Sequence, residues 1–272
     1  MIAVIIIVAV IVVLALLYVL SVRGRRKHPK LSKLRKWSYA HRGLHDKPHI
    51  PENSLHAFYL ALQKGYGIEL DVHLMRDGEI AVIHDSTLER TTGQKGKIEH
   101  LTTRDLSRYN LEGTDETIPL FKDVLAMYNG RAPLIIELKT AGGNAAKLCE
   151  GVFKLLDDYK GLYCVESFDP RCLLWLKKNR PEVCRGQLAQ NFLKNPSGMG
   201  RVIDFVLTFM LENFLTRPDF IAYKFSDRKN LSNVLCLKLW KLQGASWTLR
   251  NKAVYHEALG EGLIPIFEKF EP

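Results

Sequence analysis

Acidic residues are absent from the first 38 positions of this 272-residue chain, and charged residues of either sign are absent from the first 22. Eight basic residues lie between Arg23 and Lys36, so the remaining 234 residues carry 31 basic and 29 acidic side chains. Eight of the ten net positive charges therefore belong to a short N-terminal segment. A nucleic-acid-binding domain carries its basic excess on its folded surface, and we expect no nucleic-acid partner.

The sequence also lacks several signals of metal and nucleotide binding. Its five cysteines form no CxxC pair and are odd in number, which favours reduced thiols over disulfides or a zinc site. No GxGxxG or Walker A loop follows any predicted strand, which argues against the nucleotide-binding folds. The hydrophobic content of 47% and charged content of 25% are those of an ordinary globular chain.

Residues 1–22 consist mainly of Ile, Val, Leu and Ala, and a helix needs about 20 such residues to cross a bilayer core. A cleaved signal peptide is the alternative, but its basic residues precede an apolar run of about 7–15 residues. We therefore expect a transmembrane helix over 1–22 and a basic juxtamembrane linker over 23–37. Basic flanks stay in the cytoplasm, which predicts a single-pass protein with a cytoplasmic domain and a linker on anionic membrane lipids.

Short apolar runs then alternate with helical periods, a pattern typical of parallel strands joined by crossover helices. Eight strands are predicted, over residues 38–41, 67–72, 79–84, 134–138, 162–167, 183–188, 220–225 and 245–248. Eight such units predict an α/β fold, a (β/α)₈ TIM barrel over 38–272 preceded by the transmembrane helix. A doubly wound open sheet is the competing architecture.

Ionisable side chains stand at the ends of the first four predicted strands: His41-Arg42, Glu69 with Asp71, His84-Asp85, and Glu137 with Lys139. Residues two apart on a strand point to the same face, and the carboxyl ends of barrel strands meet at one rim. Taken alone, each pair is as easily a loop or helix cap. Their occurrence at four successive strand ends predicts one shared site.

The residue types at this rim indicate a chemistry. Three carboxylates would repel one another unless they bind a divalent cation, and oxygen-only ligands favour Mg²⁺, Ca²⁺ or Mn²⁺. Arg42 and Lys139 suit an anionic oxygen such as that of phosphate. His41 and His84 can divide acid and base roles near neutral pH. Together they predict metal-assisted cleavage of a phosphate ester.

The motifs match those of a known family. They are His41-Arg42-Gly43, Pro51-Glu52-Asn53-Ser54, Glu69-Leu70-Asp71-Val72, Asp77-Gly78, His84-Asp85, Leu88-Glu89-Arg90-Thr91-Thr92-Gly93, Ile136-Glu137-Leu138-Lys139 and Trp247-Thr248. Residues 38–270 therefore resemble the glycerophosphodiester phosphodiesterase family. The resemblance implies a (β/α)₈ barrel with an insertion after the region of the second strand, and a divalent metal.

The resemblance also implies roles for single residues: His41 and His84 as the acid–base pair, Glu69, Asp71 and Glu137 as metal ligands, Arg42 and Lys139 as phosphate ligands, Asn53 as a residue that shapes the rim of the substrate site, and Trp247 as a wall of the glycerol site. For Trp247 a plain barrel-core aromatic is the alternative. The implied reaction is hydrolysis of a glycerophosphodiester to glycerol 3-phosphate and an alcohol, with water or the substrate's own glycerol hydroxyl as nucleophile.

Two other functions stay open at this stage. A lysophospholipase D would act on membrane lysophospholipids, and an apolar trough leading to the metal would distinguish it. A catalytically dead, membrane-tethered binding module is the second, although the intact set of motif residues opposes it. Homo-oligomerisation is also left open. The ending Leu263–Glu268 departs from the family's usual Gly-Ile-Ile-Thr-Asp, and we expect this departure to touch no acid–base or metal position.

Residues 201–215 form a last unusual segment. A helix there would gather Asp204, Thr208 and Glu212 in one narrow polar stripe and leave most of its circumference apolar. The helix is too short to span a membrane, since 15 residues reach only about 22 Å. It is either buried under a neighbouring loop or in a dimer contact, or it dips into the bilayer interface.

Overall fold

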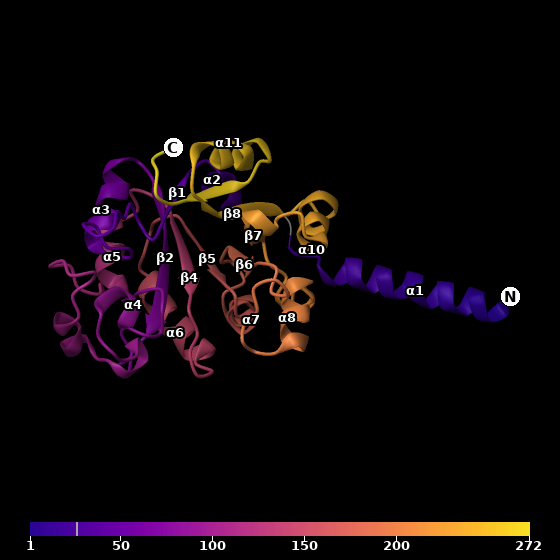
Figure 1. Cartoon of the computed structure of the whole chain (residues 1–272), viewed down its shortest axis with the longest axis horizontal. Coiled ribbons are helices and arrows are strands. Elements are labelled where there is room, and N and C mark those ends of the chain that lie inside the picture. Colours follow the sequence, from indigo (N-terminus) through magenta and orange to yellow (C-terminus); the bar gives the residue numbers. More distant parts are fainter. Residues whose placement is uncertain (26) are drawn as a thin grey trace.

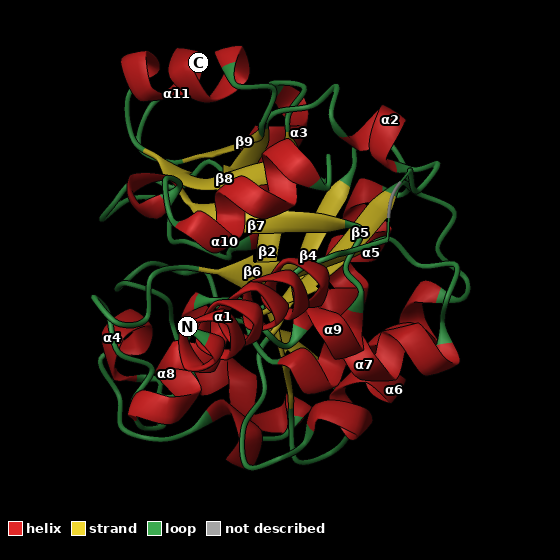
Figure 2. Cartoon of the chain, turned by 90° about the vertical axis from the view of Figure 1, so that its right-hand side faces the viewer, coloured by secondary structure: helices red, strands yellow, loops and turns green. Residues whose placement is uncertain are grey.

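Eight parallel strands close into a barrel in the computed structural model, which describes residues 1–25 and 27–272. The strands follow one another in chain order around the barrel, and the last pairs back to the first. They are β1 Tyr39–His41, β2 Gly67–Leu74, β4 Leu134–Leu138, β5 Tyr163–Ser167, β6 Arg185–Ala189, β7 Phe220–Lys224, β8 Gln243–Leu249 and β9 Ile264–Phe267. The TIM-barrel prediction is confirmed (Figure 2).

Helices on the outside of the barrel pack apolar side chains against the strands: α3 Leu55–Gln63, α5 Phe121–Tyr128, α6 Ala145–Leu156, α7 Pro170–Asn179 and α11 Lys252–Gly260. The other α-helices that follow β1 are α4 Glu89–Thr92, α8 Arg201–Thr208, α9 Asn213–Thr216 and α10 Leu231–Val234. Side chains cap two of these helices: Ser54 accepts a hydrogen bond from Ala57 N at the start of α3, and Asp169 accepts one from Arg171 N at the start of α7. Local sequence therefore determines where these helices begin.

The prediction of a barrel strand over 79–84 is wrong. Those residues contain β3, Ile80–Val82, which runs antiparallel to β2 and lies outside the barrel. The Asp77-Gly78 turn joins the two strands, whereas a parallel pair needs a crossover of about a dozen residues or more. The eighth barrel strand is instead β9, which was not among the predicted eight.

An insertion between β3 and α5 follows this hairpin, as the resemblance implied. It holds α4 and two 3₁₀ turns, Ile98–His100 and Thr103–Arg108. Leu88, Ile98 and Leu106 pack with Ile83 in a separate apolar cluster beside the barrel. This cluster fixes the strand that leads into His84.

The N-terminal helix α1, Ile2–Ser21, projects away from the barrel (Figure 1). It contains no buried residue, and its mean hydropathy is 3.5. It has the length and composition of a membrane span or of a signal sequence.

The segment after α1, expected as a linker, packs against the barrel. The Arg25 guanidinium forms a bidentate ion pair with Asp219, with Nε–Oδ1 and Nη2–Oδ2 distances of 2.6 and 2.8 Å. Helix α2, Leu31–Leu34, buries both of its leucines among inward-facing barrel residues that include Tyr39. The Tyr39 hydroxyl donates to the Leu34 carbonyl at 3.0 Å. Arg25 and residues 31–34 of this basic segment are thus packed against the folded domain.

Replacing Arg25 with methionine should lower the free energy of unfolding by about 1–3 kcal/mol, because the buried Asp219 carboxylate loses its principal partner. Thermal and denaturant unfolding of the full chain in detergent measures this. Arg35→Met, at an exposed position of the same segment, is the matched control. Equal unfolding of both variants and the parent would contradict a structural role for the segment.

Candidate active site

Three carboxylates meet at the carboxyl-terminal rim of the barrel. Glu69 and Asp71 lie within β2, and the β2–β4 register places Asp71 beside Glu137. Oxygen atoms from the three side chains lie within 4.8 Å of one another, and all three residues are buried. The trio predicted from the sequence therefore converges.

Two basic side chains form ion pairs with this acidic cluster and offset part of its negative charge. Lys139 Nζ lies 2.6 Å from Glu137 Oε1 and 3.1 Å from Asp71 Oδ1, and Arg42 Nε lies 3.2 Å from Asp71 Oδ2. Arg42 adopts a positive φ of 57° directly after β1, and its backbone N–H donates to the Glu69 carbonyl at 2.9 Å. This tight turn brings its guanidinium back over the rim.

The surroundings shift the pKa values of the three carboxyl groups in different directions. Burial, then the charges of Asp71 and Glu137, raises the pKa of Glu69 well above its usual range, and burial also raises the pKa of Glu137. The pKa of Asp71 is lowered, because Lys139, His84 and Arg42 together outweigh its burial. A buried, oxygen-only donor set held near two cations fits a hard divalent ion such as Mg²⁺, Ca²⁺ or Mn²⁺.

His41 ends β1 at the edge of this cluster. Its Nδ1 lies 3.1 Å from Glu268 Oε2, and its Nε2 lies 3.8 Å from Glu69 Oε2. Burial lowers the pKa of His41 to about 4, against the hydrogen bond with Glu268, so the imidazole is neutral at pH 7. Burial opposes ionisation of Glu268, but its hydrogen bond with His41 and the charge of His41 lower its pKa to about 2.

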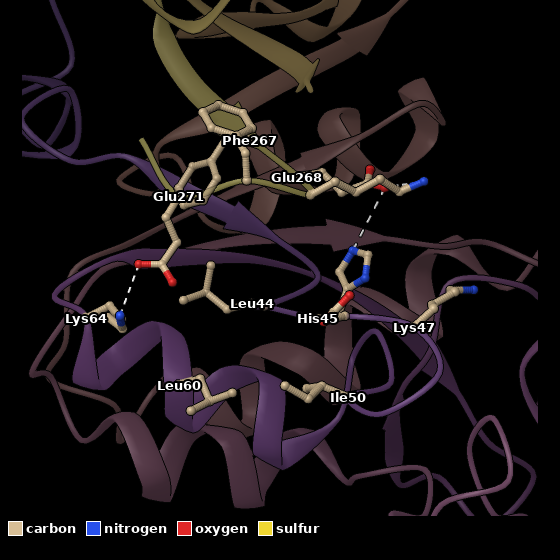
Figure 3. Close-up of a pocket in the computed structure, with 13 residues that line it drawn as sticks. Leu44, His45, Lys47, Ile50, Leu60, Lys64, Phe267, Glu268 and Glu271 are labelled. Atoms are coloured by element: carbon tan, nitrogen blue, oxygen red, sulfur yellow. Dashed lines mark ion pairs between the residues drawn. The ribbon is translucent and has the colours of Figure 1, made fainter. Parts of the chain in front are cut away.

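The expectation that the Leu263–Glu268 departure touches none of the residues predicted for acid–base catalysis is wrong, because Glu268 contacts His41. Glu268 directly follows β9 and holds His41 from a position 227 residues away in the sequence. Its second oxygen, Oε1, lies 4.0 Å from His45 Nε2 (Figure 3). Glu268 and His45 line a pocket of about 680 Å³. Only the closure of the barrel between β1 and β9 brings these residues together.

His84 belongs to the same site, but the strand that leads to it runs in the opposite direction to the barrel strands. It follows the antiparallel β3, and the preceding residue, Ile83, donates its N–H to the Asp71 carbonyl at 3.1 Å. His84 Nδ1 lies 2.6 Å from Asp85 Oδ1. The His73 ring also holds this strand end, with its Nε2 3.2 Å from the His84 carbonyl oxygen. His84 therefore lies with Glu137 and Lys139 at the rim, although the strand that leads to it is not the barrel strand that was predicted.

Asn53 and its neighbour Glu52 organise the rim. Asn53 is buried at a positive φ of 55°, and its Nδ2 donates to Asp71 Oδ2 at 2.9 Å. Glu52 accepts hydrogen bonds from Arg42 at 2.7 Å and from Arg90 at 2.7 and 2.9 Å. Arg90 also donates to Asp85, so this network connects the surroundings of the two histidines.

Sequence reasoning gave no role to Glu52, Arg90, Glu166 or Glu268. Glu166 lies on β5 opposite Glu137, and its burial beside that carboxylate raises its pKa well above its usual range. The signal that could have identified Glu166 is an acidic residue inside a buried strand. Glu52 and Arg90 were visible only as parts of motifs, and their side-chain partners lie far away in the sequence.

Trp247 lies on β8 and is partly buried. Its ring meets Phe168 edge to face with centroids 5.8 Å apart, and its Nε1 donates to the Ala222 carbonyl at 3.2 Å. Phe168 in turn lines a pocket at the rim, whereas Trp247 packs against Phe168 and does not line that pocket.

That pocket, about 850 Å³ in volume, extends from the acidic cluster to α8. Its polar end includes His84, Glu137 and Lys139. Its far wall is apolar and is formed by Phe168, Phe192, Met199, Ile203, Val206 and Leu207. Glu212 also lines it, and burial raises the pKa of this carboxyl to about 8, so the side chain is protonated at neutral pH. An apolar trough therefore leads to the predicted metal site.

Comparison with known proteins places this geometry in a family. Residues 41–268 match the glycerophosphoryl diester phosphodiesterase family. The chain is 42% identical over 169 residues to a Bacillus altitudinis glycerophosphodiester phosphodiesterase, covering 58% of this chain and 68% of that protein. It is 26% identical over 258 residues to human glycerophosphodiester phosphodiesterase 1, covering 83% and 76%.

Solved structures show the same fold. An Oleispira antarctica phosphodiesterase, in complex with the product sn-glycerol-3-phosphate, has a TM-score of 0.73 and 23% identity, and the match covers 90% of this chain and 95% of that one. The predicted motifs, the barrel and the converging site agree with the match over residues 41–268. The chain is a member of the glycerophosphoryl diester phosphodiesterase family and a phosphoric diester hydrolase.

Proposed function

We propose that this enzyme hydrolyses glycerophosphodiesters to glycerol 3-phosphate and an alcohol, using a divalent metal and two histidines. The observation that carries the proposal is the convergence of two imidazoles, three carboxylates and two basic side chains at one rim. The family supports the reaction class. The proposal includes a separate role for each predicted site residue, namely His41, His84, Glu69, Asp71, Glu137, Arg42, Lys139, Asn53 and Trp247.

Each histidine has a carboxylate at Nδ1, which leaves Nε2 for proton transfer. Glu268 holds His41 and Asp85 holds His84. A carboxylate in this position fixes the tautomer and stabilises the imidazolium that forms during the reaction. One imidazole takes a proton from the attacking hydroxyl, and the other gives a proton to the leaving alcohol.

The phosphoryl group would be bound by the cations of the rim. Arg42 presents a planar guanidinium that suits two phosphoryl oxygens, and Lys139 provides a point charge beside Glu137. Glu69, Asp71 and Glu137 would hold the metal, which supplies Lewis-acid stabilisation of charge on the phosphoryl oxygens. Asn53 keeps Asp71 oriented through its hydrogen bond.

Replacing His41 or His84 with alanine should reduce turnover of glycerophosphocholine by about 10²–10⁴-fold, because general acid–base catalysis is lost. Glu268→Gln should reduce it by about 10–100-fold and shift the pH–rate profile, because His41 loses its orienting carboxylate. Glu271→Gln, an exposed neighbour paired with Lys64, is the control. Near-normal turnover by His41→Ala would refute the assignment.

Removing divalent metal with EDTA should abolish hydrolysis, and Mg²⁺, Mn²⁺ or Ca²⁺ should restore it. Asp71→Asn should weaken metal binding, measured by calorimetry without substrate, because the most acidic ligand of the cluster is lost. Glu79→Gln, in the exposed β2–β3 turn, should bind metal as the parent does. Full activity in excess EDTA would contradict the metal proposal.

A second substrate class is favoured by the apolar trough. Its wall from Phe168 to Leu207 gives a single acyl chain a place to lie while the phosphodiester faces the acidic cluster. We propose lysophospholipids as this class, reached by an enzyme whose α1 spans a membrane with the barrel on the cytoplasmic side. The apolar composition of α1 and the basic residues that follow it support this placement.

A charge placed in the trough should separate the two substrate classes. Met199→Asp should lower the ratio of kcat/KM for lysophosphatidylcholine to that for glycerophosphocholine by about 10–100-fold, because a carboxylate would then lie against the acyl chain. Leu193→Asp, equally exposed but outside the trough, is the matched control. An unchanged ratio for Met199→Asp would remove the lysophospholipid candidate.

A further inference from the structure

Helix α8 reverses the arrangement expected of a surface helix. Asp204 and Thr208, two of the three residues of the predicted polar stripe, are buried with 4% and 1% of their surface exposed. Val202 and Phe205 face outward with 76% and 50% exposed. The segment is also not one helix, since α8 ends at Thr208 and α9 begins at Asn213. Among the described residues no loop covers its apolar face, so the alternative of burial under a neighbouring loop is wrong.

Hydrogen bonds fix this orientation. The Ser197 backbone N–H and hydroxyl both donate to Asp204, at 2.9 and 2.6 Å. Leu193 N–H donates to the Thr208 hydroxyl at 3.2 Å, and the Ser232 hydroxyl donates to the Thr208 carbonyl at 2.8 Å. The polar side of α8 therefore ties down the preceding loop and the start of α10. The helix cannot rotate its apolar side inward without breaking these bonds.

The exposed apolar side chains are concentrated on one side of the molecule. After α1, the described part of the chain exposes twelve large hydrophobic side chains, and ten of them lie between residues 193 and 239. We call these ten the anchor-side surface: Leu193, Met199, Val202, Ile203, Phe205, Phe214, Leu215, Leu231, Val234 and Leu239. So large an apolar area on a water-facing surface indicates a binding site.

The anchor-side surface surrounds the base of α1. Figure 1 shows α1 leaving the barrel on the side of α8 and α10, and Figure 2, viewed nearly along α1, shows α8, α9 and α10 around it. The Tyr18 ring meets Phe209 edge to face at 6.0 Å, and Trp240 Nε1 donates to the Val19 carbonyl at 2.8 Å. Tyrosine and tryptophan at the end of an apolar helix are typical of a membrane–water interface.

Charge on this side is also of one sign. From 191 to 241, all of which the structure describes, every acidic side chain is buried or half-buried, whereas five basic residues are exposed. They are Lys194, Arg201, Lys229, Lys238 and Lys241. Basic residues beside an apolar face suit anionic lipid head groups. A second copy of this surface would present the same positive charge to itself, which favours a bilayer over a dimer.

We propose that the anchor-side surface lies in the head-group and upper acyl region of a lipid bilayer beside α1. Met199 and Ile203 belong both to this surface and to the wall of the apolar trough. The trough therefore opens where single-chain lipids reside, and such a lipid reaches the acidic cluster without crossing water. The inference rests on the proposed membrane placement of α1, and it is independent of the catalytic roles.

The test places a fluorescent label on the surface of the full chain. Val202→Cys is labelled with an environment-sensitive dye, since all five native cysteines are buried, and the protein is reconstituted into phosphatidylcholine–phosphatidylglycerol vesicles. Leu259→Cys, exposed on α11, is the matched control. We expect nitroxide-labelled lipids to quench the dye at 202 and aqueous iodide to spare it, with the reverse at 259.

Two outcomes would overturn the proposal. Quenching at 202 by iodide as strong as at 259 would show a water-facing surface. Protection at 202 from both quenchers, together with a dimer in sedimentation, would show a protein contact instead. Because this readout needs no turnover, lipid quenching of an inactive enzyme would refute the proposed function and leave the surface intact.

Kinetics give a second readout. Val202→Ser/Phe205→Ser should lower kcat/KM for lysophospholipid in vesicles severalfold and leave turnover of water-soluble glycerophosphocholine unchanged, because neither residue lines the trough. Tyr59→Ser/Leu259→Ser, which removes the two exposed apolar side chains elsewhere, is the control. Equal vesicle kinetics for both double variants would contradict an interfacial role for α8.

Discussion

Repulsion among buried carboxylates is the constraint on which this site depends. Glu69, Asp71, Glu137 and Glu166 all face the inside of one barrel, where low polarity strengthens every charge interaction. Lys139 and Arg42 offset part of that repulsion, and the positive-φ turns at Arg42 and Asn53 hold the compensating groups in place. A bound cation would complete the balance, so metal affinity and barrel stability are properties of the same cluster.

The motif residues could be predicted because the chemistry limits which residue types can stand there. Strand alternation placed Glu69 with Asp71, and Glu137 with Lys139, on common faces, and the barrel register confirms the meeting of Asp71 and Glu137. His84 lies beside the cluster as predicted, although β3 is not a barrel strand. A motif predicts which residue type stands at the site. The direction of the strand that leads to this residue depends on the preceding turn, which here is the Asp77-Gly78 hairpin.

What the sequence could not predict depends on contacts between distant segments. Glu268 orients His41 only after the last strand pairs with the first. The leucines of α2 became core residues because the barrel leaves room among its inward-facing side chains. The inverted face of α8 was also unpredictable, since periodicity shows that polar residues share a stripe but not which way that stripe points.

The contacts after α1 have a mechanical consequence. Val22 is fully buried, and Arg25 is clamped to Asp219 within four residues of the end of α1. A flexible tether would let an enzyme tumble above a membrane and sample every orientation. Here the axis of the helix and the axis of the barrel are coupled, so with α1 in a bilayer as proposed the tilt of the catalytic mouth is set by the fold. Encounter with a lipid then becomes a search by lateral diffusion in two dimensions.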